Sequence, residues 1–176
     1  LGGAELFYTR LVNALRNRRH SVLAITVADS RISARLDPPI PQVHIPMWGV
    51  ADLPSRWRIG RVLRARQPEI VQTYMGRATR LTRIAPGGRP IHVARLGGYY
   101  APHGYRHAHA WIAASPGIRE HLLRHGFPAN RIFLIGNFVA PYQPSPLASL
   151  GQLRREFDIP DDALIVTAVG RLHPVK

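Results

Sequence analysis

Two short segments of this chain could bind phosphate groups. Gly2 and Gly3 precede a helical pattern, and a glycine pair lets the backbone approach a phosphate while the amides and dipole of the following helix favour its charge. A glycine turn that only connects a strand to a helix is the alternative explanation. Arg171 and Lys176 lie five residues apart after an apolar segment, so both cations could point at a diphosphate, which a guanidinium can bind through two hydrogen bonds.

The elements that must position these residues alternate between helix and strand. Apolar residues recur at helical spacing in residues 5–18 and 55–66, a short helix is expected at 77–84, and Ser115 with Pro116 is typical of another helix start. Short apolar runs predict strands at residues 21–27, 43–45, 69–73, 91–95, 111–114 and 132–135. This alternation predicts an α/β fold with a Rossmann-like, doubly wound parallel sheet, which binds ligands at the carboxyl ends of its strands.

The sequence changes in character after Asn137. A proline-rich stretch at 140–148 indicates a linker, a helix is expected near 150–157, and a further strand at 164–169. Because the opening glycines have no preceding strand and the last strand has no partner, we expect a chain truncated at both ends. The expected division is a first domain at 1–139, a linker and helix at 140–162, and the start of a second domain at 163–176.

Several segments resemble, in the same order, the family 4 (group 1) glycosyltransferases of GT-B fold. The resemblance rests on the opening Gly-Gly-Ala-Glu, on the segments 111–118, 126–132 and 136–139, and above all on the final segment from Gly170 to Lys176. It implies the amino-terminal half of a two-domain enzyme, in which an acceptor-binding domain precedes a donor domain and sugar transfer occurs between them. It also implies retention of anomeric configuration, with no metal and no other cofactor.

The resemblance assigns roles to residues at both ends of the chain. Gly2 and Gly3 would approach the diphosphate of a nucleotide-sugar donor, and Arg171 and Lys176 would neutralise it from the second domain. A departing nucleoside diphosphate gains negative charge in the transition state, and fixed amides and cations stabilise that charge in place of a divalent metal. The usual active-site histidine position is Gly97 here, so the catalytic residue stays unknown. The paired glutamates of the donor domain would lie beyond the last residue, so the chain alone is expected to be inactive.

Two segments at predicted strand ends are candidates for binding the acceptor. The first is Gly97-Gly98-Tyr99-Tyr100, whose tyrosine rings could stack on a sugar, together with Arg95, which could pair with an anionic group. The second contains Tyr74 and Arg77. Glycine turns with half-buried tyrosines would explain the same residues without a binding role.

The chain is strongly basic, with a formal net charge of +14. This charge favours an anionic partner, namely nucleic acid, a phosphorylated substrate or an acidic membrane surface, although a genome rich in arginine codons would also produce it. Eleven arginines and one acid lie between Leu53 and Arg106. The helix at 56–66 adds an apolar stripe, as a helix on a membrane interface does. Ordinary packing with a solvated basic face is the alternative.

Other kinds of site have little support. The chain has no cysteine, which excludes disulfides and thiolate ligands. His103, His107 and His109 lack accompanying carboxylates, so no metal site is expected there. A basic nucleic-acid-binding module and a dinucleotide-binding oxidoreductase are the alternative functions, but the first rests on charge alone and the second lacks Gly-x-Gly-x-x-Gly after a strand.

The sequence therefore predicts an incomplete hexosyltransferase-type glycosyltransferase. Its expected partners are a nucleotide-diphosphate sugar and a lipopolysaccharide, lipid-linked or other cell-surface glycan acceptor, because similar arginine-rich sequences with Gly-Gly-Tyr-Tyr look like that branch of the family. No nucleic-acid partner is expected. We expect a bacterial, cytoplasmic protein, and leave open its peripheral attachment to the anionic inner face of the cytoplasmic membrane.

Overall fold

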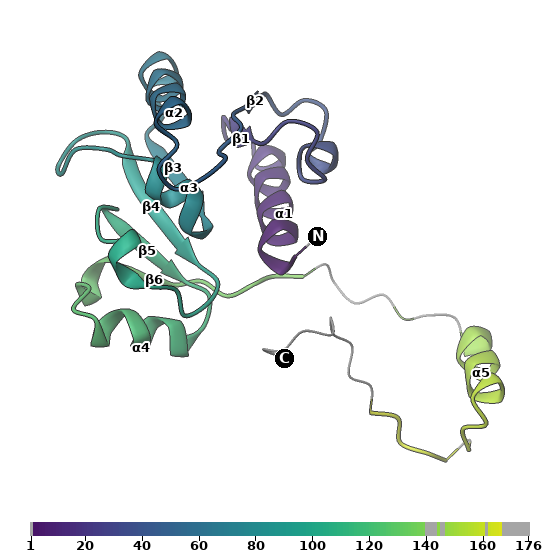
Figure 1. Cartoon of the computed structure of the whole chain (residues 1–176). Coiled ribbons are helices and arrows are strands. Elements are labelled where there is room, and N and C mark those ends of the chain that lie inside the picture. The colour runs from purple at the N-terminus through teal and green to yellow at the C-terminus, as the bar shows by residue number, and fades with distance from the viewer. Residues whose placement is uncertain (1, 140–143, 145–146, 161, 167–176) are drawn as a thin grey trace. The chain divides into compact units, whose positions relative to one another are not determined.

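The computed structural model describes residues 2–139, 144, 147–160 and 162–166. The chain divides into two compact units, Leu1–Phe138 and Val139–Lys176, and Figure 1 labels their α-helices and strands. The first unit contains, in order, α1 (Gly3–Asn17), β1 (Ala24–Thr26), η1 (Ser33–Arg35), β2 (Gln42–His44), α2 (Leu53–Arg66), β3 (Ile70–Tyr74), α3 (Met75–Leu81), β4 (Ile91–Leu96), η2 (Pro102–Gly104), β5 (Ala110–Ala113), α4 (Pro116–Arg124), η3 (Ala129–Arg131) and β6 (Ile132–Leu134). The second contains α5 (Leu147–Glu156). The assignment of acceptor and donor domains to these parts of the chain stays a prediction.

All strand pairs in the described residues are parallel. β1 pairs with β2 in a two-stranded sheet, and β3, β4, β5 and β6 pair in that order in a four-stranded sheet. The predicted alternation of helix and strand is present. The strands form two sheets rather than one, because no hydrogen-bond ladder among the described residues joins β1 to β3.

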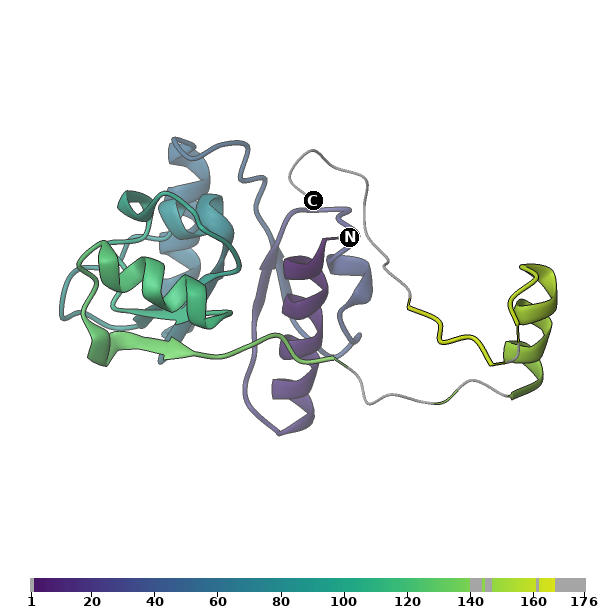
Figure 2. The same ribbon diagram turned by 90° about the horizontal axis from the view of Figure 1, so that it is seen from below.

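Helices pack on the four-stranded sheet and beside the smaller one. α3 contacts β3 and β4, and α4 contacts β5 and β6. In Figure 1, α2 and α4 lie at opposite ends of this sheet, and Figure 2 shows α1 alongside β1. The main core contains Leu122 of α4 and Trp111 of β5, whose ring meets the edge of Phe127 at a centroid distance of 4.8 Å. Within the described residues, none of the helices has the length and apolar character needed to cross a membrane.

Local chemistry at the helix ends sets their boundaries. Before α4, the Ser115 hydroxyl accepts a hydrogen bond from the Ile118 N–H at 3.3 Å, and Pro116 takes the first helical position. Gly126 follows the end of α4 with a φ of +74°, a conformation that favours glycine. Before α2, the Asp52 carboxylate accepts from the Ser55 N–H at 2.9 Å.

Two predicted elements differ from the structure. The helix expected at 77–84 runs from Met75 to Leu81. Beyond that end, His107 Nε2 lies 2.8 Å from the Thr79 carbonyl and 3.0 Å from the Thr82 carbonyl. A longer helix could not bond the Thr82 carbonyl in any case, because Pro86 has no N–H. Of the strand expected at 164–169, residues 164–166 form no strand, because they have no ladder partner among the described residues. Residues 167–169 and most of the predicted linker lie outside those residues.

Candidate functional site

The predicted acceptor segments lie together at one edge of the four-stranded sheet. The carboxyl ends of parallel strands share an edge, and this edge is where such sheets bind ligands. We call the residues that follow β3, β4, β5 and β6 the strand-end edge; they are residues 75–77, 97–100, 114–117 and 135–137. Tyr74 and Arg95 are register partners on neighbouring strands. The structure therefore brings the two segments side by side.

Arg95 is buried, with 3% of its surface exposed. Its guanidinium carbon lies 3.8 Å from the centre of the Phe7 ring, and its Nη2 donates to Asn137 Oδ1 at 2.6 Å. Burial lowers the pKa of Arg95, whereas Tyr74 and Tyr100 act in the opposite direction. Its Nε has no hydrogen-bond partner among the described residues. Arg95 thus joins α1, β4 and the turn after β6, and its pairing with an anionic acceptor stays a prediction.

The two tyrosines after β4 differ in how accessible they are. Tyr99 is 68% exposed, and the edge of its ring meets His121 of α4 at a centroid distance of 5.5 Å. A Cβ added at Gly117 would lie 2.4 Å from the Tyr99 hydroxyl, so a side chain there would displace the exposed tyrosine ring. Tyr100 stacks on the buried Tyr105 at 6.0 Å with 12° between the rings. Tyr99 therefore has the more open ring for stacking on a sugar.

The segment after β3 presents Arg77 rather than Tyr74. The Tyr74 ring is half-buried and meets Tyr8 of α1 edge to face at 5.0 Å, and its hydroxyl accepts from Gln72 Nε2 at 2.9 Å. Burial raises the pKa of Tyr74. Met75 and Arg77 are exposed, and Met75 has a φ of +65°, a strained conformation of the kind that occurs at functional sites.

The predicted diphosphate site is described only in part. Gly2 and Gly3 are exposed at the start of α1, and the Gly2 N–H donates to Glu5 Oε2 at 2.7 Å. A phosphate at this helix end would compete with the Glu5 carboxylate for the same N–H. Arg171 and Lys176 lie outside the described residues. Gly97 is exposed at the end of β4 and Gly98 is half-buried.

A buried chain of hydrogen bonds lies behind the strand-end edge. The Thr79 hydroxyl donates to the Met75 carbonyl at 2.8 Å, so the Thr73 hydroxyl, 3.0 Å away, must donate to Thr79. His92 Nε2, at 2.9 Å from the Thr73 oxygen, must in turn donate to Thr73. His92 therefore carries its proton on Nε2, and its Nδ1 is an acceptor with no partner among the described residues.

The pKa of His92 reflects this position. Burial, and then the charges of His107, His109 and Arg83, lower the pKa of His92 to about 3. Burial is also the main cause that lowers the pKa of His107. Both imidazoles are therefore neutral at physiological pH.

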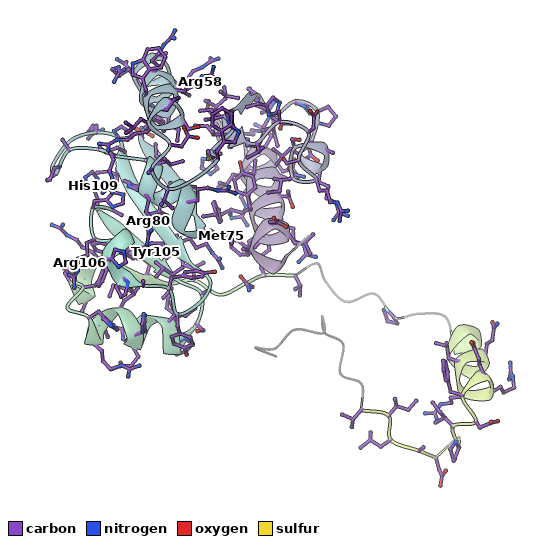
Figure 3. All side chains as sticks on the ribbon, viewed as in Figure 1. Arg58, Met75, Arg80, Tyr105, Arg106 and His109 are labelled. Atoms are coloured by element: carbon purple, nitrogen blue, oxygen red, sulfur yellow. The ribbon has the colours of Figure 1, made fainter. Side chains whose placement is uncertain are left out.

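The histidines of the loop before β5 bind protein groups. His103 Nε2 lies 3.2 Å from Arg80 Nη2, and Figure 3 shows Arg80 beside Tyr105. His107 bonds the end of α3, while His109 Nδ1 accepts from the His92 N–H at 3.1 Å and its Nε2 donates to the Ala85 carbonyl at 3.1 Å. No group of three or more metal-binding side chains occurs in the part of the chain that the structure describes.

Sequence reasoning missed Phe7, Asn137 and His92 as partners of the site. Asn137 belongs to segment 136–139 of the family resemblance, and no local pattern reveals its bond to an arginine 42 residues away. The sequence does contain a signal that His92 and Arg95 are buried polar residues, because both interrupt the otherwise apolar run of β4. Buried polar groups need partners.

Comparison with known proteins identifies relatives for most of the chain. The model of the family described as Glycosyltransferase Family 4 matches residues 1–142. The lipopolysaccharide core biosynthesis glycosyltransferase LpsD of Rhizobium meliloti (strain 1021) is 26% identical over 173 residues, which are 97% of this chain and 48% of LpsD.

Two solved structures of Anabaena Alr3699/HepE have the same fold. One is in complex with UDP and glucose; it is 20% identical, has a TM-score of 0.64, and the match covers 89% of this chain and 47% of that one. The other is in complex with UDP-glucose, at 19% identity, a TM-score of 0.65, and coverage of 90% and 47%. This likeness confirms the predicted Rossmann-like α/β fold with parallel strands. The chain spans about half the length of these relatives.

Proposed function

The chain belongs to glycosyltransferase family 4, and on this premise we propose that the whole protein transfers a sugar from a nucleotide-diphosphate sugar to a glycan acceptor. The family match over residues 1–142 is the observation that carries the proposal. The strand-end edge supports it, because Tyr99 offers an open ring and Arg77 a cation where a parallel sheet binds ligands.

We propose that the donor diphosphate binds between backbone amides and cations, without a metal. The exposed Gly2 and Gly3 would let phosphate oxygens reach the amides of α1. Arg171 and Lys176 would supply positive charge as the phosphate leaves. The HepE structures hold UDP and UDP-glucose, so uridine nucleotide sugars are the first donors to test. The same arrangement would suit a retaining transfer in which the leaving phosphate accepts the proton of the acceptor.

The acceptor that we propose is a lipopolysaccharide, lipid-linked or other cell-surface glycan. The similarity to LpsD, a lipopolysaccharide core biosynthesis glycosyltransferase, supports this class. An acceptor with a lipid anchor would place the enzyme at the cytoplasmic face of the membrane. The exposed Tyr99 ring would stack on a sugar of the acceptor, because aromatic faces bind the apolar faces of sugars.

Release of nucleoside diphosphate by the full-length protein tests the proposal. A panel of nucleotide sugars, beginning with UDP-glucose, is incubated with and without lipopolysaccharide core acceptors, in the presence of a chelator. We expect release that depends on both donor and acceptor and persists without divalent metal. The anomeric configuration of the product, read by nuclear magnetic resonance, tests retention. A folded protein that releases no nucleoside diphosphate with any donor and acceptor would contradict the proposal.

Arg171→Ala tests the role of the cation. The variant should lower kcat on the order of 100-fold, the usual cost of losing one group that stabilises transition-state charge. Arg18→Ala is the matched control, because Arg18 is an exposed arginine at the end of α1. Unchanged turnover in the Arg171→Ala enzyme would contradict the metal-free stabilisation proposed here.

A further inference from the structure

α2 and the loop before it combine exposed apolar side chains with cations. Five arginines and no acidic residue lie on α2. Four apolar side chains of α2 and the loop before it are at least half exposed: Trp48 (79%), Val50 (50%), Leu53 (67%) and Trp57 (57%). We call these residues and the arginines of the helix the α2 surface. Figure 3 shows Arg58 of this surface well apart from Met75 of the strand-end edge.

A groove of about 350 Å³ lies between α2 and the segment that follows α3. Leucine, isoleucine and tryptophan side chains of α2 form its apolar lining, and its cations are Arg56, Arg64 and Arg83. Gly60 also lines the groove, and a Cβ added there would lie 3.4 Å from Arg64 Nη1. The missing side chain at residue 60 therefore leaves room in the groove.

The charge of the groove is positive, because no acidic side chain is among the described residues that line it. Partial burial, and then repulsion by Arg56 and Arg80, lower the pKa of Arg83. Arg56, Arg64 and Arg83 are exposed. Like charges around one groove repel each other, and a bound anion relieves that repulsion. The groove is therefore complementary to an anionic group with an apolar body.

Hydrogen bonds fix the loop that carries the exposed Trp48. The Asp52 carboxylate accepts from the Trp48 N–H at 2.9 Å and from the Ser55 hydroxyl at 2.6 Å. The Met47 N–H donates to the Ser55 hydroxyl at 3.0 Å. An ordered loop loses little conformational entropy when it docks, so the backbone that carries the exposed Trp48 is fixed in advance of binding.

We propose that the α2 surface docks on an anionic membrane, with the phosphate of a lipid headgroup seated in the groove between Arg56, Arg64 and Arg83. Trp48 and Trp57 enter the headgroup region, where indole rings are favoured. The surrounding arginines are attracted to the negative surface potential of acidic lipids. The docking deepens the proposed function, because it brings the enzyme to a lipid-linked acceptor. The binding itself rests only on the α2 surface and Arg83.

Co-sedimentation of the chain with lipid vesicles tests the docking without any catalytic step. Vesicles of phosphatidylcholine alone are compared with vesicles that also contain phosphatidylglycerol. We expect binding only to the second kind, and weaker binding as salt rises. Replacing Arg56, Arg64 and Arg83 with Gln should weaken it on the order of 100-fold, since each arginine near an anionic surface contributes about fivefold.

A control variant separates the groove from the overall charge. Arg18→Gln, Arg124→Gln and Arg131→Gln remove the same number of charges from exposed positions on other elements, and should bind nearly as well as the original chain. Equal losses in the two triple variants would overturn the proposal in favour of diffuse charge attraction.

Gly60→Leu tests the groove with every charge retained. The leucine should fill the groove and weaken vesicle binding. It should not unfold α2, because leucine favours the helix more than glycine does. Unchanged vesicle binding by Gly60→Leu would show that no headgroup sits there.

Inorganic phosphate distinguishes a lipid from a free anion. A thermal shift with phosphate that depends on the three groove arginines, together with no binding to acidic vesicles, would assign the groove to a soluble anion and overturn membrane docking. Loss of sugar transfer in the full-length enzyme with vesicle binding intact would leave the docking standing and contradict only the proposed function.

Discussion

Acid should destabilise the first unit because His92 is buried in its neutral form. The ring donates from Nε2 to Thr73 at 2.9 Å and has no partner for Nδ1 among the described residues. Protonation of Nδ1 would bury a charge without compensation. The perturbation is therefore a fall in pH from about 7.5 to about 5, across the range in which an unfolded histidine gains its proton.

The magnitude follows from the two pKa values of His92. The pKa is 6.5 in the reference state and about 3 in the folded protein. Between these values the unfolded state binds more protons, so the free energy of unfolding falls by about 1.4 kcal/mol for each unit of pH decrease. This stability is fully present above pH 6.5 and is lost as the pH falls towards 3. From pH 7.5 to 5 the loss from this residue is about 2 kcal/mol, and the lowered pKa of His107 adds to it in the same direction.

Urea unfolding at several pH values, followed by tryptophan fluorescence, measures this loss. His92→Gln removes the titrating group while its amide can still donate to Thr73. Between pH 7 and 5, the variant should bind about one proton fewer on unfolding than the original chain does. His20→Gln, at an exposed position, is the control and should keep the pH dependence of the original chain.

Two outcomes would refute this reasoning. A free energy of unfolding that stays constant or rises as the pH falls from 7.5 to 5 would mean that no histidine is held neutral by burial. If the free energy of unfolding of His92→Gln depends on pH as that of the original chain does, other residues cause the loss of stability in acid. Asp52 does not confuse the result, because its lowered pKa, caused mainly by its hydrogen bonds to Ser55, acts in the more acid range of carboxylates.

Three further predictions concern stability and are measured by urea unfolding at neutral pH. Thr73→Val should cost about 1–3 kcal/mol, because it leaves the buried His92 Nε2–H without its acceptor; no loss would contradict the direction assigned to the hydrogen-bond chain. Ser115→Ala should cost about 0.5–2 kcal/mol through loss of the cap of α4, whereas Ser115→Asp should retain most of the stability. Leu122→Ala should cost about 2–5 kcal/mol, because its side chain is fully buried in the main core, and a cost below 1 kcal/mol would mean that the core collapses around the gap.

Much of the fold could be predicted because its signals are local. Ser115 and Pro116 start a helix through groups within three residues of one another, so the sequence alone contains the whole interaction. The apolar runs also predict β3 to β6, and the predicted bounds differ from those in the structure by about one residue. The pairing of the strands into two sheets could not be predicted, because a ladder depends on which strands meet in space.

The details of the site depend on contacts between distant residues. The carbonyls of Thr79 and Thr82 at the end of α3 face His107, which lies 28 and 25 residues further along the chain, and a helical pattern cannot reveal such a partner. Arg95 was placed on the correct strand and at the correct edge. Its burial follows from Phe7 and Asn137, which come from the two ends of the first unit, and only the folded chain brings them together.

The arginines of the first unit differ in their surroundings, and we expect them to differ in function. Arg95 is buried at the strand-end edge, where a single amide oxygen and an aromatic face accompany its charge. Arg56, Arg64 and Arg83 instead surround an open groove on the α2 surface. A uniform basic coat would attract nucleic acid and membranes alike, whereas a groove with an apolar lining selects anions that carry an apolar body. Because Arg95 and the groove arginines lie on different elements, changes on α2 should alter attachment to lipid without altering turnover of a soluble acceptor.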